Sequence, residues 1–179
     1  MTKANDDITF ERLREVMHYD PVTGDFTRRI SLGANAPAGE IAGSLKPSGY
    51  VTIDIDGKRY RAHRLAWLYV TGEHPRSMVD HRDNIRNHNW WSNLRLADHQ
   101  QNGANSRPKR FNTSGYKGVY WCKQTEKWRA KINVDRRQIH LGSFSTREEA
   151  AAAYAHGAAR YFGEFSRTHA GVNISPPPY

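Results

Sequence analysis

The chain has 179 residues, 37% of them hydrophobic, and a mean hydropathy of −0.84, so its hydrophobic cores must be small. Lys and Arg number 27 against 18 Asp and Glu, and the formal net charge of +9 predicts a polyanionic partner. The single cysteine, Cys122, excludes an intrachain disulfide and a cysteine-rich zinc site. No apolar run has membrane-spanning length and no signal-peptide core begins the chain, which predicts no membrane partner and a location in a reducing cytoplasm.

The charge is distributed unevenly along the chain. Residues 1–106 contain 14 Lys or Arg and 13 Asp or Glu, a net of +1, whereas residues 107–179 contain 13 and 5, a net of +8. This division predicts two modules. The basic, proline-containing segment 107–113 is the predicted linker between them, and residues 174–179, which end in PPPY, are a predicted tail.

The beginning of the chain predicts a short helix followed by a strand. Residues 5–20 have helical spacing of apolar residues, and Asp6 or Asp7 is the candidate cap. Residues 21–25 have the Pro and Gly of a turn, and a strand begins at Phe26.

The next part of the chain predicts a hairpin followed by a helix. Residues 31–49 are rich in small residues and predict a loop. From Val51 onward apolar and polar residues alternate around Asp56-Gly57, a favoured two-residue turn. Residues 63–71 predict a helix that Gly72 ends.

His and Asn residues are concentrated between Met78 and Asn105, where residues 78–81 and 92–97 predict strands and residues 98–105 a short helix. Asp80 offers a carboxylate and His81 an imidazole, a suitable base near pH 7. If the two strands pair and the helix packs across them, Asp80, His81 and Asn102 converge. Such a group has the oxygen ligands and the base that metal-assisted hydrolysis of a phosphodiester requires.

The stretch VDHRDNIRNHNWWSNLRLADHQQNGAN resembles the HNH endonuclease motif of phage and intron-encoded homing enzymes. The order His, then Asn-Leu-Arg, then Gln-Asn agrees in spacing, and the preceding DPVTGDF and YRAHRLAWLYVTG also resemble segments that precede the motif there. The resemblance covers roughly residues 20–105. It implies a ββα-metal (His-Me finger) nuclease fold with an HNH core at about residues 50–105.

The same resemblance implies a role for each matched residue. His81 is the implied general base that deprotonates the attacking water, and Asn93 the implied residue that orients the site and fixes the loop. Asp80 and Asn102 are the implied ligands of one divalent metal ion, Mg²⁺ with Mn²⁺ as a substitute. Asn102 stands where some members of the family have His, and an amide oxygen suits Mg²⁺ better than Zn²⁺.

Alternatives remain open within this stretch. Asp83 can replace or assist Asp80 as a ligand, and Asn105 can assist Asn102. Trp90 and Trp91 are interpreted as residues that pack the loop onto the core. Surface, loop or packing roles are the simplest interpretation of the remaining polar residues in and near the motif: His63, His74, His88, His99, Asn84, Asn87 and Asn89.

The second module, residues 114–173, predicts a three-stranded sheet and a helix. Trp128, Ala130 and Ile132 alternate with polar residues, which indicates a sheet with one apolar and one basic face. The Ala-rich helix that follows has Ser145 or Thr146 as cap with Glu148 or Glu149 completing a capping box, and Gly163 ends it.

This module resembles the ethylene-response-factor (APETALA-two) DNA-binding domain. The resemblance rests on Tyr116–Val119, Leu141–Phe144 and Glu148–Tyr154, and it implies a sheet in the major groove with a helix packed behind it. Core positions are favoured for Trp121, Trp128 and Phe144. The residues implied to face DNA are Lys117, Tyr120, Lys127, Arg129, Lys131, Asn133 and His140.

The whole chain is therefore expected to be an α+β protein, a metal-dependent DNA endonuclease directed to double-stranded DNA by its C-terminal sheet. With one site per chain, a monomer would nick DNA, whereas a homodimer or sequential cuts would break both strands. The expected setting is a bacterial or phage-infected cell. The alternatives are a non-catalytic DNA-binding regulator with a degenerate nuclease fold and, less simply, a protein that acts on RNA, whose A-form major groove is too narrow for a sheet.

Overall fold

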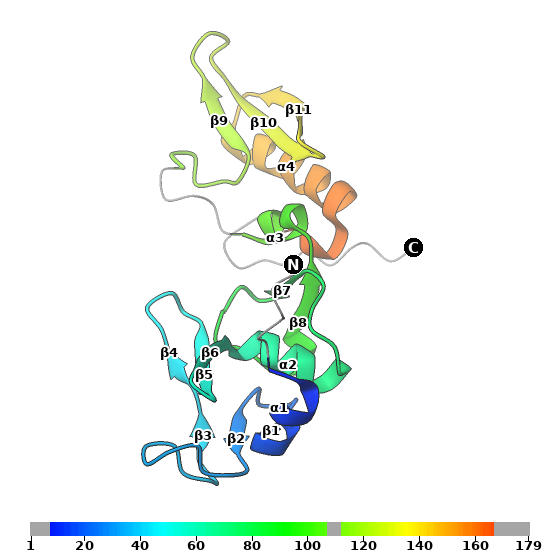
Figure 1. Cartoon of the computed structure of the whole chain (residues 1–179). Helices are drawn as coiled ribbons and strands as arrows, with labels where there is room; N and C mark the ends of the chain where they lie inside the picture. Colours follow the sequence, from blue (N-terminus) through cyan, green and yellow to red (C-terminus); the bar gives the residue numbers. More distant parts are fainter. Residues whose placement is uncertain (1–7, 107–111, 167–179) are drawn as a thin grey trace, which may run out of the picture. The chain divides into compact units, whose positions relative to one another are not determined.

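The computed structural model describes residues 8–106 and 112–166 and divides the chain into two compact units, residues 1–96 and 97–179 (Figure 1). The boundary expected from charge, at residue 106, follows the short helix α3, whereas the structural division precedes it. The predicted caps Asp6 and Asp7, most of the predicted linker and the tail 174–179 lie outside the described residues.

The first unit begins with a helix that is shorter than the sequence predicts. α1 (Phe10–Val16) is capped by Thr9, whose side chain accepts a hydrogen bond from the Arg12 backbone. The chain then enters β1 (Met17–Tyr19), which pairs with β2 (Phe26–Arg28), and β2 pairs with β3 (Ile41–Ala42). Met17 and Tyr19 are buried while the residue between them is exposed, the alternation of a strand.

The predicted hairpin and the helix after it are both present. β5 (Val51–Ile55) pairs with β6 (Lys58–Arg61) and with the two-residue strand β4 (Ser44–Leu45). Both turn residues, Asp56 and Gly57, have positive φ, as a tight hairpin turn requires. α2 (Ala62–Thr71) follows directly and ends at Gly72 in the left-handed conformation.

Two further strands complete the first unit. β7 (Met78–His81) pairs with β8 (Leu94–Ala97), which follows the 3₁₀ turn η1 (Trp91–Asn93). One hydrophobic core holds α1, α2 and these small sheets together. Its largest fully buried side chains include Tyr19, Phe26 and Leu13.

The second unit is a three-stranded antiparallel sheet with a helix on one face. Its strands are β9 (Val119–Cys122), β10 (Lys127–Val134) and β11 (Arg137–Phe144), with β10 in the centre. α4 (Arg147–Phe162) packs against this sheet and starts with a capping box of Thr146 and Glu149, as the sequence predicts (Figure 1). Ala130, Ile132, Ala150 and Tyr154 are buried between sheet and helix.

The short helix α3 (His99–Asn105) also belongs to the second unit. Asp98 and Gln101 form its capping box. Its residue Ala104 packs with Phe165 of the 3₁₀ turn η2 (Gly163–Phe165), and Gln100 Oε1 accepts a hydrogen bond from the Asp135 backbone at 2.7 Å. The fold is thus mixed α/β with small antiparallel sheets. Strand, strand and helix follow one another in the predicted order, but their convergence on one metal ion stays a prediction.

Candidate active site

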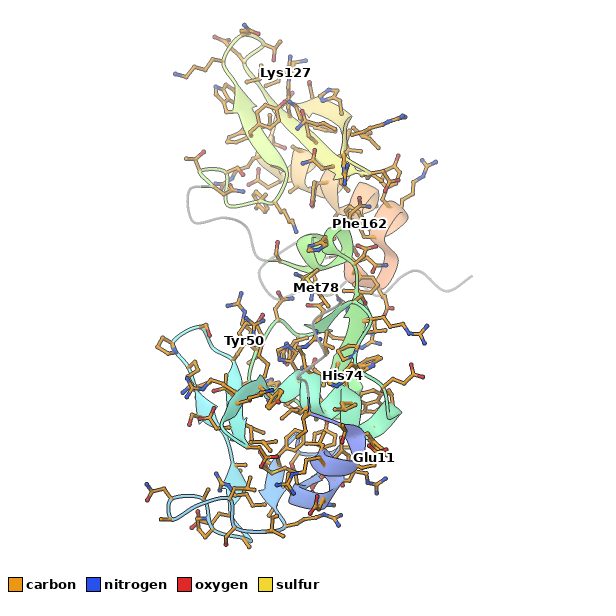
Figure 2. The ribbon with its side chains drawn as sticks, in the orientation of Figure 1. Glu11, Tyr50, His74, Met78, Lys127 and Phe162 are labelled. Atoms are coloured by element: carbon orange, nitrogen blue, oxygen red, sulfur yellow. The ribbon has the colours of Figure 1, made fainter. Side chains whose placement is uncertain are left out.

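His81 is the last residue of β7 and is only 4% exposed. Its Nε2 lies 3.1 Å from Oδ1 of Asn89, which is equally buried. The His63 and His81 rings form an edge-to-face pair with centroids 5.0 Å apart, and the Tyr50 ring, labelled in Figure 2, lies 6.1 Å from the His81 ring. Burial lowers the pKa of His81, although the hydrogen bond to Asn89 and the charges of Asp83 and Asp80 oppose the shift. The imidazole of His81 is therefore neutral at pH 7.

His63, from the first turn of α2, also remains neutral. Burial lowers its pKa to about 3, helped by the neighbouring His81 and Arg61. Its Nδ1 is buried without a hydrogen-bond partner among the residues that the structure describes. A neutral neighbour places no positive charge against His81, so His63 is a packing residue, in line with the interpretation from sequence.

Asp80 directly precedes His81, and it is 8% exposed. Its Oδ2 accepts hydrogen bonds from Nε and one terminal nitrogen of Arg95, on β8, at 3.2 and 3.1 Å. Side-chain exposures of 9% for Asp80 and 6% for Arg95 make this a buried ion pair. Arg95 neutralises this carboxylate within the protein, and a metal ion at Asp80 would share the carboxylate with Arg95.

Asn93 fixes the loop that connects β7 and β8. Its Nδ2 donates to Asp83 Oδ1 at 3.0 Å and to the His88 carbonyl at 2.8 Å, and its Oδ1 accepts from the Asp83 backbone at 3.1 Å. Its own carbonyl accepts from the Arg82 backbone at 2.9 Å. The hydrogen bonds of Asn93 hold both ends of this loop together, while its role in orienting the site stays a prediction.

Asp83, the alternative metal ligand, is used within the same loop. Its carboxylate accepts from Asn93, from the Ile85 backbone at 2.8 Å and from His88 Nδ1 at 2.6 Å. Burial would raise its pKa, but these hydrogen bonds outweigh burial and lower it. Asp83 is thus a loop anchor. Trp91 packs this loop onto the core, since its ring lies 5.0 Å from that of Trp67.

The second predicted ligand, Asn102, is exposed on α3, and Asn105 on the same helix is buried. Because α3 belongs to the second unit, the meeting of Asn102 with Asp80 stays a prediction. Across the described ranges 8–106 and 112–166, no cluster of three His, Cys, Asp or Glu side chains could hold a metal ion. The predicted ligands, the carboxylate of Asp80 and the amide of Asn102, would not form such a cluster of three.

Two functional candidates were not recognised from the sequence. Asn89 contacts the imidazole of His81, and Arg95 holds the carboxylate of Asp80. Arg95 stands in the Asn-Leu-Arg part of the motif, so its position contains a usable signal. Asn89 is one of several Asn residues in the loop, and nothing in the local sequence distinguishes it.

Basic side chains surround the Tyr50 ring next to His81. The guanidinium groups of Arg61 and Arg86 lie 4.6 and 4.9 Å from its centroid. Arg61 also lines a cavity of about 590 Å³ together with Arg64 and His74. Clustered arginine side chains favour the approach of anions to this surface.

In the second unit, the register of the sheet aligns most of the predicted DNA-facing residues on one face. Arg129 is paired with Tyr120 and Lys131 with His140, while Lys127 and Asn133 follow at alternate positions of β10. Lys131 Nζ lies 4.7 Å from the Tyr120 ring centroid, and Lys127 lies near the turn end of the hairpin (Figure 2). This polar face includes six of the seven predicted residues: Tyr120, Lys127, Arg129, Lys131, Asn133 and His140.

Lys117 and Trp121 differ from the sequence interpretation. The ammonium group of Lys117 donates to the carbonyls of Gly103 and Ala104 at 2.6 Å and to that of Ser106 at 3.1 Å, so it caps the end of α3. Trp121 is 45% exposed at the margin of the core, 5.3 Å from the Trp128 ring. A strand with one side open explains this exposure, because β9 is an edge strand.

The sequence model of the HNH endonuclease family matches residues 60–104, from the end of β6 through most of α3. Protein 3.8 of Escherichia phage T7 is 33% identical over 98 residues, which are 54% of this chain and 81% of that protein. The chain belongs to the HNH endonuclease family. The matched segment of the HNH domain contains Asp80, His81, Asn89, Asn93 and Asn102.

Two further relatives match parts of the chain. An uncharacterized HNH endonuclease of Acanthamoeba polyphaga mimivirus is 32% identical over 124 residues, 68% of this chain and 63% of that protein. An ethylene-responsive transcription factor-like protein of Arabidopsis thaliana is 53% identical over 38 residues, 21% of this chain but only 16% of the plant protein. The HNH relationship is therefore established, whereas the likeness to the plant protein is partial. No helix among the described residues is long and apolar enough to span a membrane.

Proposed function

We propose that the protein is a metal-dependent DNA endonuclease of the homing type in which His81 is the general base. The observation that carries this proposal is a buried, neutral imidazole next to the carboxyl group of Asp80, within the segment that matches the HNH family. A positioned neutral imidazole can accept the proton of an attacking water molecule. Asn93 supports the base indirectly, because it holds the loop that follows His81.

The proposed cofactor is one divalent metal ion, Mg²⁺ with Mn²⁺ as a substitute, bound by Asp80 and Asn102. A carboxylate and an amide oxygen are hard ligands that suit such an ion, so the donor chemistry fits. When bound, the ion would neutralise charge on the scissile phosphate and the leaving oxygen. Arg95 supports the arrangement by holding Oδ2 of Asp80 at 3.1 Å, which limits the orientations of the carboxylate.

The second unit is proposed to bind double-stranded DNA through the polar face of its sheet. Its charge supports this, because residues 107–179 contribute +8 of the formal net charge. A sheet can enter the major groove while Lys and Arg hold phosphates. The basic surface around Tyr50 in the first unit is suited to bind the phosphate backbone of the DNA near the scissile bond. With one site per chain, we propose that the monomer nicks DNA and that a homodimer would cut both strands.

Incubation of supercoiled plasmid with the full chain tests the proposal. We expect Mg²⁺ or Mn²⁺ to permit conversion to the nicked or linear form, and EDTA to abolish it, because the phosphate charge is then no longer neutralised. Gel electrophoresis measures the conversion, and the products should end in 5′-phosphate and 3′-hydroxyl. Cleavage that continues unchanged in EDTA would contradict the metal dependence.

Different consequences are expected for two lysines that the sequence did not distinguish. Lys131→Ala should weaken DNA binding and reduce the slope of log K against log salt concentration by about 0.9, the value for one phosphate contact. Lys117→Ala should leave that slope unchanged and lower the thermal stability, because it removes the cap on α3. Fluorescence anisotropy at several salt concentrations measures both slopes. Equal slopes for the two variants would contradict the assigned face.

The second candidate function is a DNA-binding regulator that does not cut. The buried ion pair between Asp80 and Arg95 favours it, because a carboxylate neutralised by an internal cation binds a metal ion less strongly. A wild-type protein that binds DNA but leaves plasmid and target intact in Mg²⁺ and Mn²⁺ would establish this alternative.

A further inference from the structure

We infer that Asn89 is a positioning residue that holds the imidazole of His81 in one tautomer and one orientation, and that the turn formed by residues 20–25 holds Asn89 in place. The role of His81 as base rests on the proposed function, but the contact and its consequences for the imidazole do not.

The side chains of Asn89 and His81 contact each other directly. Oδ1 of Asn89 lies 3.1 Å from Nε2 of His81, and both residues are 4% exposed. An amide oxygen only accepts hydrogen bonds, so Nε2 must carry the proton. A neutral imidazole has one N–H, and Nδ1 is then the basic nitrogen. Asn89 thus favours the tautomer of His81 in which Nε2 carries the proton.

A hydrogen bond from the core holds the backbone of Asn89. The hydroxyl of Tyr19, on β1, donates to the backbone carbonyl of Asn89 at 2.7 Å, across a separation of 70 residues. Tyr19 is 2% exposed, and its ring packs 4.8 Å from that of Phe26. Burial raises the pKa of Tyr19, so its phenol keeps its proton and remains a donor. The backbone of Asn89 is therefore tied to the rigid centre of the first unit.

The turn at residues 20–25 closely approaches the backbone at Asn89 and Trp90. Gly24 has φ +84°, and a Cβ atom there would lie 2.4 Å from the Asn89 carbonyl carbon and 2.4 Å from the Trp90 nitrogen. The carbonyl of Pro21 accepts from the Trp91 backbone at 2.9 Å, just beyond. Asp20 stabilises the turn, because its Oδ1 accepts from the Val22 backbone at 2.8 Å. The turn contacts the chain at and after Asn89, which prevents this segment from shifting away from His81.

Nuclear magnetic resonance of ¹⁵N-histidine-labelled full-length protein tests the inference without any need for cleavage. The wild type should show His81 as a single Nε2–H tautomer, with its signals assigned by their loss in His81→Ala. Asn89→Ala should give a mixture of tautomers, because the acceptor is gone. Asn87→Ala, an exposed residue of the same loop, is the control and should leave the spectrum unchanged. A single, unchanged tautomer in Asn89→Ala would overturn the inference.

The cleavage assay adds a second readout. Asn89→Ala should lower kcat by about 10–100-fold, the usual effect of removing a group that orients a histidine, with KM for DNA unchanged. Asn89→Asp, which keeps an accepting oxygen, should restore the single tautomer. If the wild type does not cleave while the tautomer still depends on Asn89, the proposed function fails and the positioning role stands.

The contribution of the turn is tested by a pair of glycine variants. Gly24→Ala and Gly39→Ala introduce the same strain, because φ is +84° at Gly24 and +83° at Gly39, but only Gly24 faces other atoms within 4 Å. Gly24→Ala should alter the His81 signals and Gly39→Ala should not. Tyr19→Phe, which keeps the ring and removes the donor, should act in the same direction as Gly24→Ala. If both Gly24→Ala and Tyr19→Phe leave the His81 signals unchanged, the turn does not hold Asn89.

Discussion

Replacement of His81 by alanine is expected to lower the rate of plasmid cleavage by about 10²–10⁴-fold, the usual contribution of a positioned general base. The affinity for DNA should remain within a small factor of wild type, because His81 is buried and carries no charge at neutral pH. Single-turnover cleavage and fluorescence anisotropy on the same duplex measure the two quantities separately.

The controls for this experiment address folding and specificity. His81→Gln keeps a donor for Asn89 Oδ1 without a base, so it should lose activity while it retains more stability than His81→Ala. His18→Ala changes an exposed histidine on β1 and should cleave like wild type. If His81→Ala cuts as fast as the wild type, His81 is not the base.

Among the proposed substitutions, Asp80→Ala is expected to lower the free energy of unfolding the most. It removes the carboxylate that accepts two hydrogen bonds from the guanidinium of Arg95, whose side chain is only 6% exposed. Breaking a buried ion pair from one side costs about 3–5 kcal/mol of unfolding free energy. Urea unfolding of the full chain, followed by circular dichroism, measures the loss.

The matched comparison is Asp54→Ala. Asp54 also accepts two hydrogen bonds from one arginine, Arg59, but both side chains are 61% exposed. An exposed pair of this kind contributes only about 0–1 kcal/mol. Equal losses in Asp80→Ala and Asp54→Ala would contradict the buried character of the Asp80–Arg95 pair.

The proposed ligand role of Asp80 needs a variant that folds. Asp80→Asn keeps the shape and one accepting oxygen, so it should lose less stability than Asp80→Ala. Its affinity for Mn²⁺, followed by electron paramagnetic resonance, should nevertheless fall, because a neutral amide is a weaker ligand than a carboxylate. Unchanged Mn²⁺ affinity would remove Asp80 from the proposed ligand set.

Much of the fold follows from local signals in the sequence. The turn at Asp56-Gly57, the end of α2 at Gly72 and the capping box of α4 depend on residues within a few positions of each other, and all three are confirmed. The α1 boundary was wrong because tertiary burial of Met17 and Tyr19 overrides the helical spacing.

The candidate site was predictable only where the family motif specifies it. The positions of Asp80 and His81 at the end of a strand follow from the motif, and both are buried as a site requires. The partner of His81 could not be predicted, because the support of Asn89 comes from Tyr19, 70 residues away. Likewise, Lys117 contacts α3 only through the tertiary fold, so its charge alone could not predict this contact.

The alternation along β10 has a consequence for protein engineering. Ala130 and Ile132 form the core with α4, whereas Lys127, Lys131 and Asn133 occupy the opposite face together with His140 of β11. Tyr120 and Arg129 each bury a polar atom and are best left constant. If this face binds DNA as proposed, Lys127, Lys131, Asn133 and His140 can be randomised together in one library and selected for a new target sequence, because none of them belongs to the core.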